Sequence, residues 1–307
     1  MSSVPVWRHY DQAALDRQYD SRGTVADAGI FLRAYAEQTR RAKINFACME
    51  NLKYGSGTEE KLDIYRAAAA PGTGFPVMVF LHGGDWRFLS KEEGGFAAPA
   101  FVSAGVMFVA LDFRLVPSTT LPAMGEQVRR ALHWLYLNVA AYGGDANRLH
   151  IAGHSSGANL VGQLLMTDWS TAFHAPADLI KSAVMISGLG DLEPVRLSFR
   201  NQQLHLTPAD VDQASLQRRT PGTHCPLLVV VGECETDDYR LQSRRLADFW
   251  QAQGNQAQFF ELKDRHHFDA LLEWGDPASA VFSAHIGLIM GENGASRSGG
   301  QVPQSAP

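Results

Sequence analysis

A serine set between glycines is the first feature of this chain that could do chemistry. Residues 153–157 read Gly-His-Ser-Ser-Gly and match the pattern G-x-S-x-G. An apolar run at 149–152 precedes them, and a helical pattern follows from about residue 157 to 167. A sharp turn between a strand and a helix lifts the central hydroxyl above a sheet, where it can attack a carbonyl group. We therefore predict that Ser155 is a nucleophile.

A serine hydroxyl is a poor nucleophile at neutral pH, so Ser155 needs a general base. In folds that present serine on such a turn, the partners follow in the order serine, acid, histidine. The base should then lie in the loop after the last strand, which we expect at 258–262. His266 and His267 occupy that loop. Either imidazole could serve as the base.

The carboxylate that orients the imidazole should follow the apolar run at 227–231. Four candidates lie there: Glu233, Glu235, Asp237 and Asp238. The role needs one partly buried carboxylate that holds the imidazole tautomer and stabilises the imidazolium. Spacing alone does not choose among the four side chains.

Two glycines after another apolar run, 76–81, complete the chemical pattern. They belong to the segment His82-Gly83-Gly84. Because glycine lets the backbone pass close to the nucleophile, the N–H groups of Gly83 and Gly84 can stabilise a developing oxyanion. The N–H of Ser156, directly after the nucleophile, should complete this oxyanion hole. We expect His82 to hold the loop rather than to react.

The elements that must position these residues alternate between strands and helices. Continuous apolar strands separated by helices are typical of a mainly parallel sheet covered by helices on both faces. The expected fold class is therefore α/β. The expected strands are 61–65, 76–81, 106–111, 149–152, 182–187, 227–231 and 258–262, and the expected helices are 24–43, 128–139, 157–167 and 240–253.

The chain divides into three parts. Residues 1–50 are expected to form a polar, helical arm that packs on the core. Residues 51–290 should form the catalytic domain. Residues 291–307 are dominated by Gly, Ser, Gln and Pro, have little to bury, and should be disordered.

Composition and charge narrow the class of protein. The 307 residues are 45% hydrophobic, and the net charge is −5. A mildly acidic chain has no electrostatic footprint for nucleic acid or for anionic lipid. The longest apolar run, 101–111, is too short to span a bilayer. We therefore expect a protein that binds neither nucleic acid nor a membrane.

The cysteines and histidines argue against a disulfide framework and a metal site. Cys48, Cys225 and Cys234 are too few for a framework and show no CxxC spacing. Free thiols, together with the absence of an apolar segment near the N-terminus, predict a cytoplasmic protein. The histidines do not cluster with carboxylates at ligand spacing, and no phosphate loop or dinucleotide fingerprint is present. We expect neither a metal nor a cofactor.

These features together resemble the α/β-hydrolase superfamily. Within it, the chain resembles the arylformamidases, also called kynurenine formamidases, from the N-terminal arm to about residue 285. The segments that carry the resemblance are Lys61-Leu62-Asp63-Ile64-Tyr65, His82-Gly83-Gly84 with Trp86, the serine turn at 153–157, Ser187-Gly188 with Asp191-Leu192-Glu193-Pro194, Val230-Val231-Gly232, Arg240 with Gln242-Ser243, and His267-Phe268.

The resemblance implies a serine hydrolase that cleaves an aryl formamide to an arylamine and formate through an acyl-enzyme. It assigns Ser155 as the nucleophile, His267 as the base and Glu235 as the acid. Better-known family members have aspartate at the acid position, so Asp237 and Asp238 stay alternatives. A broader carboxylesterase or aryl amidase is the alternative function. A binding protein without chemistry is disfavoured by the intact serine, histidine and oxyanion loop.

The substrate implied by the resemblance is a small aromatic amide or ester, which needs an apolar cleft. Trp86 is an expected wall of that cleft, with Phe88 and Phe113 as further candidates. Asp85 departs from the family pattern, in which this position is more often aromatic or small. A carboxylate there would repel an anionic acyl group and could instead meet a substrate amine. A homodimer is compatible with all of these features.

Overall fold

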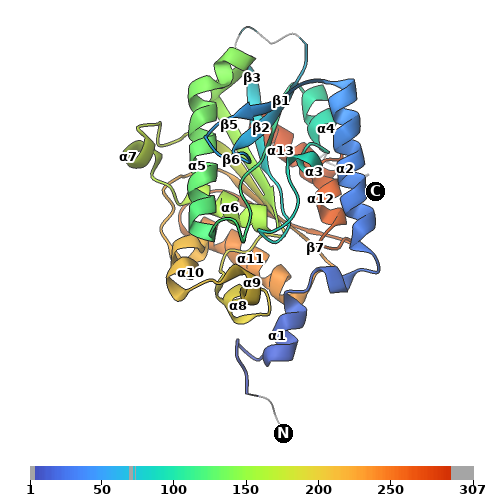
Figure 1. Cartoon of the computed structure of the whole chain (residues 1–307), viewed down its shortest axis with the longest axis vertical. Coiled ribbons are helices and arrows are strands. Elements are labelled where there is room, and N and C mark those ends of the chain that lie inside the picture. The colour runs from blue at the N-terminus through green and yellow to red at the C-terminus, as the bar shows by residue number, and fades with distance from the viewer. Residues whose placement is uncertain (1–3, 69–71, 73, 292–307) are drawn as a thin grey trace, which may run out of the picture.

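An eight-stranded sheet forms the centre of the protein (Figure 1). The computed structural model describes residues 4–68, 72 and 74–291 of the chain. Neighbouring strands follow the order β1-β2-β4-β3-β5-β6-β7-β8. Their bounds are β1 (Ala47–Lys53), β2 (Lys61–Arg66), β3 (Phe75–Leu81), β4 (Met107–Leu111), β5 (Gly144–His154), β6 (Ile180–Ile186), β7 (Leu227–Gly232) and β8 (Ala257–Leu262).

The sheet is mainly parallel, which confirms the predicted fold class. β2 runs antiparallel to both of its neighbours, β1 and β4, and the other neighbouring pairs are parallel. β3 and β5 are paired so that Leu81 lies opposite Gly153. Because both strands end at this level, the loop after β3 and the turn after β5 meet at the carboxyl ends of the sheet.

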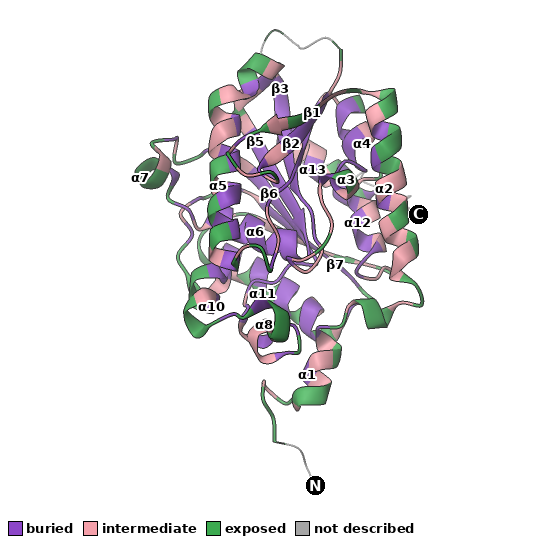
Figure 2. Cartoon of the chain, in the orientation of Figure 1, coloured by how far each residue is buried: buried purple, intermediate pink, exposed green. Residues whose placement is uncertain are grey.

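Helices cover both faces of the sheet, and the buried strands lie between them (Figure 2). Side chains alternate along β3: Val77 and Val79 pack with one helical layer, and Met78 and Phe80 pack with the other. Burial on both faces explains why β3 is a continuous apolar run. The first layer contains α5 (Leu121–Asn138), α6 (Ser156–Leu165) and α11 (Asp237–Ala252), and the second contains α2 (Ala28–Asn45), α4 (Ala98–Ser103), α12 (Asp269–Trp274) and α13 (Ala280–Met290).

Shorter helices connect these elements. In the part of the chain that the structure describes, no helix is both long and apolar enough to cross a membrane. The short helices are α1 (Gln12–Gln18), η1 (Arg22–Thr24), α3 (Lys91–Gly94), η2 (Val139–Tyr142), α7 (Trp169–Phe173), α8 (Glu193–Leu197), α9 (Asn201–Leu204), α10 (Pro208–Ala214) and η3 (Leu216–Arg218).

The N-terminal arm, formed by α1, η1 and α2, is anchored to the C-terminal third of the chain. Asp238 at the start of α11 is fully buried and accepts hydrogen bonds from Arg8 at 3.0 Å and from the Tyr19 hydroxyl at 2.5 Å. The hydroxyl of Tyr35 in α2 donates to the carbonyl oxygen of Phe268. The arm is therefore fixed at both of its helices to segments that follow the last two strands.

The helical part of the N-terminal arm ends earlier in the structure than the sequence predicts. The sequence predicts a helical arm through residue 50, whereas residues 47–50 belong to β1. This edge strand has exposed or half-buried side chains along its whole length, so it lacks the alternation that marks a half-buried strand. The predicted disordered tail, 291–307, lies outside the described residues apart from Gly291, which caps α13 in a left-handed conformation.

A cluster of charged side chains ties the arm to the sheet. Asp63 in β2 is buried and lies 3.0 Å from Lys43 Nζ in α2 and 2.9 Å from Lys91 Nζ in α3. Glu50 and Glu92 also contact Lys43. Within the described ranges, the three carboxylates are the one set compact enough to ligate a metal ion. Because two ammonium groups already pair with them, their arrangement is that of a structural ion-pair network.

Two of the buried histidines contribute a pH dependence to the stability of the fold. His150 in β5 and His285 in α13 are almost completely shielded from solvent. Burial lowers the pKa of His150 to about 3 and holds the pKa of His285 well below its usual value. Both imidazoles stay neutral in the folded chain at pH values where unfolded histidines, with a pKa of about 6.5, take up protons.

We predict that these two groups leave stability unchanged above about pH 6.5 and lower the free energy of unfolding below it. The slope should be about 1.4 kcal/mol per pH unit for each group. Urea denaturation between about pH 7.5 and pH 5 measures it. His150→Gln should reduce the slope of the unfolding free energy against pH by the contribution of one group. His224→Gln, at an exposed position, should leave the slope unchanged. Equal slopes in His150→Gln and the parent protein would contradict the prediction.

Candidate active site

The turn between β5 and α6 holds Ser155 in a strained backbone conformation. Its φ is 54° and its ψ is −118°, a region that residues with side chains rarely occupy. A Cβ at Gly153 would lie 2.4 Å from the carbonyl oxygen of Gly157, and a Cβ at Gly157 would lie 2.2 Å from that of Leu81. Both positions require glycine because neighbouring backbones pass too close for a side chain. The turn presents the Ser155 hydroxyl at the start of α6.

Two hydrogen bonds join this serine to a carboxylate. His267 Nε2 lies 3.0 Å from Ser155 Oγ, and His267 Nδ1 lies 2.7 Å from Glu235 Oε2. All three residues are buried. When Nδ1–H donates to the carboxylate, Nε2 is left as the acceptor for the serine proton. The structure thus brings together three side chains that lie 112 and 32 residues apart along the chain.

The second oxygen of Glu235 is held from two sides. Oε1 accepts a hydrogen bond from the Ser187 hydroxyl at 2.5 Å and another from the N–H of Gly232 at 2.9 Å. Ser187 directly follows β6, and Gly232 is the last residue of β7. Because both donors are fixed at strand ends, they orient the carboxylate toward His267. Ser187 had no role in our prediction beyond the family resemblance.

The other carboxylates and the second histidine have different partners. Glu233 accepts a hydrogen bond from the backbone N–H of Asp264 in the loop after β8. The side chain of Asp237 is 80% exposed in the first turn of α11, and Asp238 is the buried anchor of the arm. His266 Nδ1 accepts the N–H of Phe268 at 3.1 Å, which caps the start of α12. The geometry therefore leaves one acid and one base beside the serine.

The loop after β3, residues 82–84, packs against the serine turn, and we call it the glycine loop. A Cβ at Gly83 would approach the Cβ of Ser155 to 3.4 Å, so this backbone runs directly beside Ser155. Gly84 has a φ of +105°, and a Cβ there would lie 2.1 Å from the carbonyl oxygen of Phe88. Ser156 is the first residue of α6, where N–H groups lack a partner within the helix. The N–H groups predicted for the oxyanion hole thus belong to segments that adjoin the nucleophile.

His82 and the aromatic residues near it lie in the core. His82 Nδ1 contacts the carbonyl oxygen of Gly83 at 2.8 Å, and its ring stacks on Phe113 with centroids 4.4 Å apart. Phe113 and Trp86 are both buried in the main core, and neither lines the cavity described below. The prediction that Trp86 is a wall of the cleft is therefore not met. The tight turn at Asp85 and Trp86, both with positive φ, exposes the first residue to the cavity and buries the second.

His154, next to Ser155, is a buried neutral imidazole. Its Nε2 lies 2.8 Å from the carbonyl oxygen of His267. Burial, together with the neighbouring His267 ring, holds the pKa of His154 well below its usual value. His154 therefore supports the backbone of His267 without placing a second positive charge beside an imidazolium.

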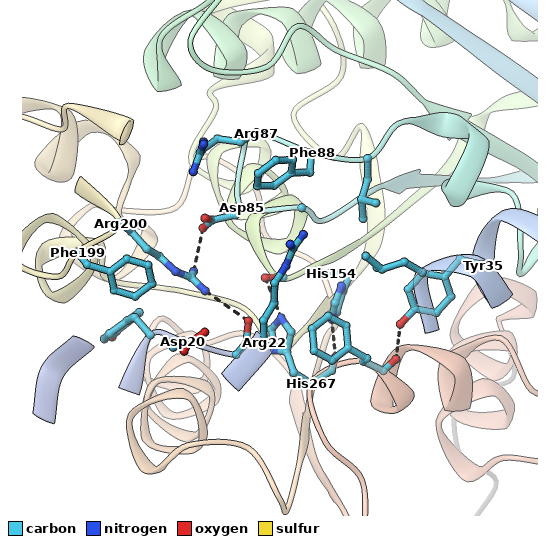
Figure 3. A pocket seen from close by; sticks show the side chains of 17 residues that line it. Asp20, Arg22, Tyr35, Asp85, Arg87, Phe88, His154, Phe199, Arg200 and His267 are labelled. Atoms are coloured by element: carbon cyan, nitrogen blue, oxygen red, sulfur yellow. Dashed lines mark hydrogen bonds and ion pairs between the residues drawn. The ribbon is translucent and has the colours of Figure 1, made fainter. Parts of the chain in front are cut away.

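A cavity of about 270 Å³ opens onto Ser155 and His267 (Figure 3). It is formed by the serine turn, the glycine loop with the residues that follow it, the segment between α8 and α9, the loop after β8 and the N-terminal arm. Its volume is close to the lower limit for small-molecule sites. Aromatic rings supply much of its apolar surface, from Tyr19, Tyr35, Phe88, Phe199 and Phe268.

The contribution of the arm was not predicted from the sequence. Tyr19, Asp20, Ser21 and Arg22 line the cavity from the segment between α1 and α2. Nothing in their local pattern marks them, because polar residues between two helices usually form a solvated loop. Their position follows from the distant contact between Tyr19 and Asp238, which sequence spacing does not reveal.

Asp85 pairs with a buried arginine that the sequence analysis did not select. Arg200 Nη1 lies 3.1 Å from Asp85 Oδ1 and 3.1 Å from the hydroxyl of Tyr239. Arg200 is only 7% exposed, and a buried cation without a counter-charge is costly. The charge of Asp85 is thus balanced within the protein, whereas the sequence suggested a carboxylate open to a substrate amine.

The sequence is similar to those of known proteins. The family model described as BD-FAE matches residues 62–182. Kynurenine formamidase from Salmo salar is 31% identical over 280 residues, which cover 86% of this chain and 92% of that protein. Kynurenine formamidase from Danio rerio is 28% identical over 276 residues, with the same two coverages of 86% and 92%.

Solved structures share the fold. A putative thioesterase from Silicibacter sp. TM1040 aligns with a TM-score of 0.76 at 24% identity, over 90% of this chain and 98% of that one. A hyperthermophilic esterase from Pyrobaculum calidifontis gives 0.68 at 20% identity, over 90% and 96%. These likenesses confirm the predicted α/β-hydrolase fold. The sequence relatives show that the chain is a hydrolase of the kynurenine formamidase family.

Proposed function

We propose that this hydrolase cleaves an aryl formamide to an arylamine and formate, with N-formylkynurenine as the reference substrate. The observation that carries the proposal is the hydrogen-bonded series Ser155, His267 and Glu235 beside a cavity lined by aromatic rings. A cavity of about 270 Å³ has room for one aryl group. The kynurenine formamidases among its relatives support the same substrate class.

The first half of the reaction forms an acyl-enzyme. Ser155 Oγ attacks the formyl carbon, and its proton passes to His267 Nε2. Glu235 stabilises the imidazolium through the Nδ1–H. The carbonyl oxygen gains negative charge, which the N–H groups of the glycine loop and Ser156 stabilise. Loss of one such donor typically slows turnover by about a hundred- to a thousand-fold.

Collapse of the tetrahedral intermediate breaks the C–N bond. His267 transfers its proton from Nε2 to the leaving nitrogen, so the arylamine departs neutral and a formyl ester remains on Ser155. In the second half, water loses a proton to His267 and attacks the ester carbon. The second tetrahedral intermediate releases formate, and Ser155 recovers its proton from the imidazolium.

A broader carboxylesterase or aryl amidase is the second candidate. Ser155 could attack an ester with the help of the same base and oxyanion donors. The fold is shared with esterases such as that from Pyrobaculum calidifontis. The two candidates differ in the acyl group that the enzyme accepts. A formamidase needs space for a single hydrogen on the carbonyl carbon, whereas a broad esterase needs space for a longer chain.

The acyl preference separates the two candidates. We predict a kcat/KM for N-formylkynurenine at least about ten-fold higher than for N-acetylkynurenine, because one methyl group in a confined pocket changes discrimination by about ten- to two-hundred-fold. Steady-state assays with both amides and with phenyl butyrate measure the preference. A higher kcat/KM for phenyl butyrate than for N-formylkynurenine would favour the broad esterase.

The nucleophile and the base can be tested together. Ser155→Ala and His267→Ala should each lower kcat by about 10⁶-fold, because neither member works without the other. His266→Ala is the matched control, since that imidazole caps α12 and should leave most of the turnover. Melting temperatures would verify that all three variants are folded. Near-normal turnover in Ser155→Ala would refute the acyl-enzyme mechanism.

The identity of the acid is tested by three isosteric changes. Glu235→Gln should lower kcat by about 10⁴-fold, as expected for loss of a triad carboxylate. Asp237→Asn should resemble the parent protein. Asp238→Asn should mainly lower stability, by about 1.5–3 kcal/mol, because Arg8 and Tyr19 lose a charged partner. Turnover and urea denaturation give the two readouts; an active Glu235→Gln protein with an inactive Asp237→Asn or Asp238→Asn protein would reassign the acid.

A further inference from the structure

Charged side chains at the cavity are not balanced. Five line it: Asp20, Arg22, Asp85, Arg87 and Arg200. Asp85 and Arg200 neutralise each other at 3.1 Å. Asp20 accepts the N–H of Gly23 and is exposed, which leaves two arginines against one exposed carboxylate. The lining therefore carries a net positive charge beside the proposed nucleophile.

Neither of the two remaining arginines is engaged by an acid. Within residues 4–68, 72 and 74–291, no carboxylate lies within ion-pair distance of Arg22 or Arg87, whereas most other arginines of the chain pair with one. Both guanidinium groups lie against the ring of Phe88, with the central carbons 5.0 Å and 4.9 Å from its centroid. Stacking occupies the flat face of a guanidinium and leaves its N–H groups available around the edge.

The two arginines come from independent parts of the fold. Arg22 belongs to η1 in the arm, and Arg87 follows the glycine loop. In Figure 3, Arg87 lies beside Phe88 on one wall of the cavity and Arg22 comes from the opposite wall. Phe88 itself is 40% exposed, so part of a large apolar ring remains open at this point, with two cations near it. This arrangement suits a planar anion next to an aromatic group.

We propose that Arg22 and Arg87 form the subsite for the carboxylate that N-formylkynurenine carries away from its scissile carbonyl. The inference rests on the proposed function, because it assigns the orientation of a substrate whose reacting carbonyl is at Ser155. The aryl group lies in the aromatic part of the cavity, near Phe88. The carboxylate accepts hydrogen bonds from the N–H groups of Arg22 and Arg87. The paired Asp85 and Arg200 contribute no net charge.

Binding to a protein that cannot turn over the ligand tests this subsite independently of catalysis. The probes are N-formylkynurenine and its carboxamide, which differ only in the carboxylate, titrated calorimetrically into Ser155→Ala protein. We expect the acid to bind at least about ten-fold more tightly than the carboxamide, since charge-assisted hydrogen bonds are the stronger ones. Added salt should weaken binding of the acid more than binding of the carboxamide.

Variants in the same background locate the effect. Arg22→Gln and Arg87→Gln should each reduce the ratio of the two affinities several-fold, and the double variant should bring it close to one. Arg22→Lys keeps the charge but loses the planar fork of the guanidinium group. Its affinity ratio should lie between that of the parent protein and that of Arg22→Gln. Arg244→Gln is the matched control, because Arg244 also stacks on a phenylalanine, Phe259 at 4.4 Å, but lies outside the cavity lining; it should keep the parent ratio.

Three results would overturn the subsite: no binding of the acid, equal affinities for acid and carboxamide, or a ratio that survives both glutamine substitutions. Failure of the proposed function gives a different pattern. In that case the protein with Ser155 intact would leave N-formylkynurenine uncleaved, while the Ser155→Ala protein would still prefer the acid and would lose that preference in the arginine variants.

Discussion

The candidate active site depends on how closely the glycine loop and the serine turn approach one another around Ser155. The register between β3 and β5 brings the glycine loop to the serine turn. At Gly153 and Gly157, the neighbouring carbonyl oxygens lie where a side chain would be. Ser155 keeps a positive φ because the sheet on one side and α6 on the other determine the turn completely. The proposed nucleophile and its proposed oxyanion donors are thereby held by the packing of backbone segments, independently of side-chain hydrogen bonds.

Much of the fold was predictable because buried parallel strands are continuous apolar runs. β3, β4 and β7 were each located to within about two residues, as boundaries of strongly patterned elements allow. β1 was missed because an edge strand with little burial carries no such pattern. Trp86 shows a different limit: a tryptophan next to an active-site loop can face the substrate or the core, and only the dihedral angles of the turn decide which.

The site was predictable as far as local motifs reach. Ser155 and the glycine loop follow from glycines at fixed positions beside strands. Glu235 could not be separated from three neighbouring carboxylates, because the deciding contacts come from Ser187 and His267, 48 and 32 residues away. The role of Arg200 was even harder to predict, because only the folded chain places it against Asp85. The electrostatic character of the cavity is thus a property of tertiary structure, although each charge is visible in the sequence.

The anchoring of the arm also has a consequence for the order of events during synthesis. Tyr19 and its partner Asp238 are 219 residues apart, and Tyr35 and Phe268 are 233 apart. Contacts of such separation form late, because a large loop must close first, and a growing chain exposes its early segments long before the later ones. A nascent chain that has not reached the loop after β8 lacks the segments that anchor the arm, so one wall of the cavity cannot form. The ability to hold a substrate arises only when synthesis has passed the loop after β8, so translation itself delays the onset of activity.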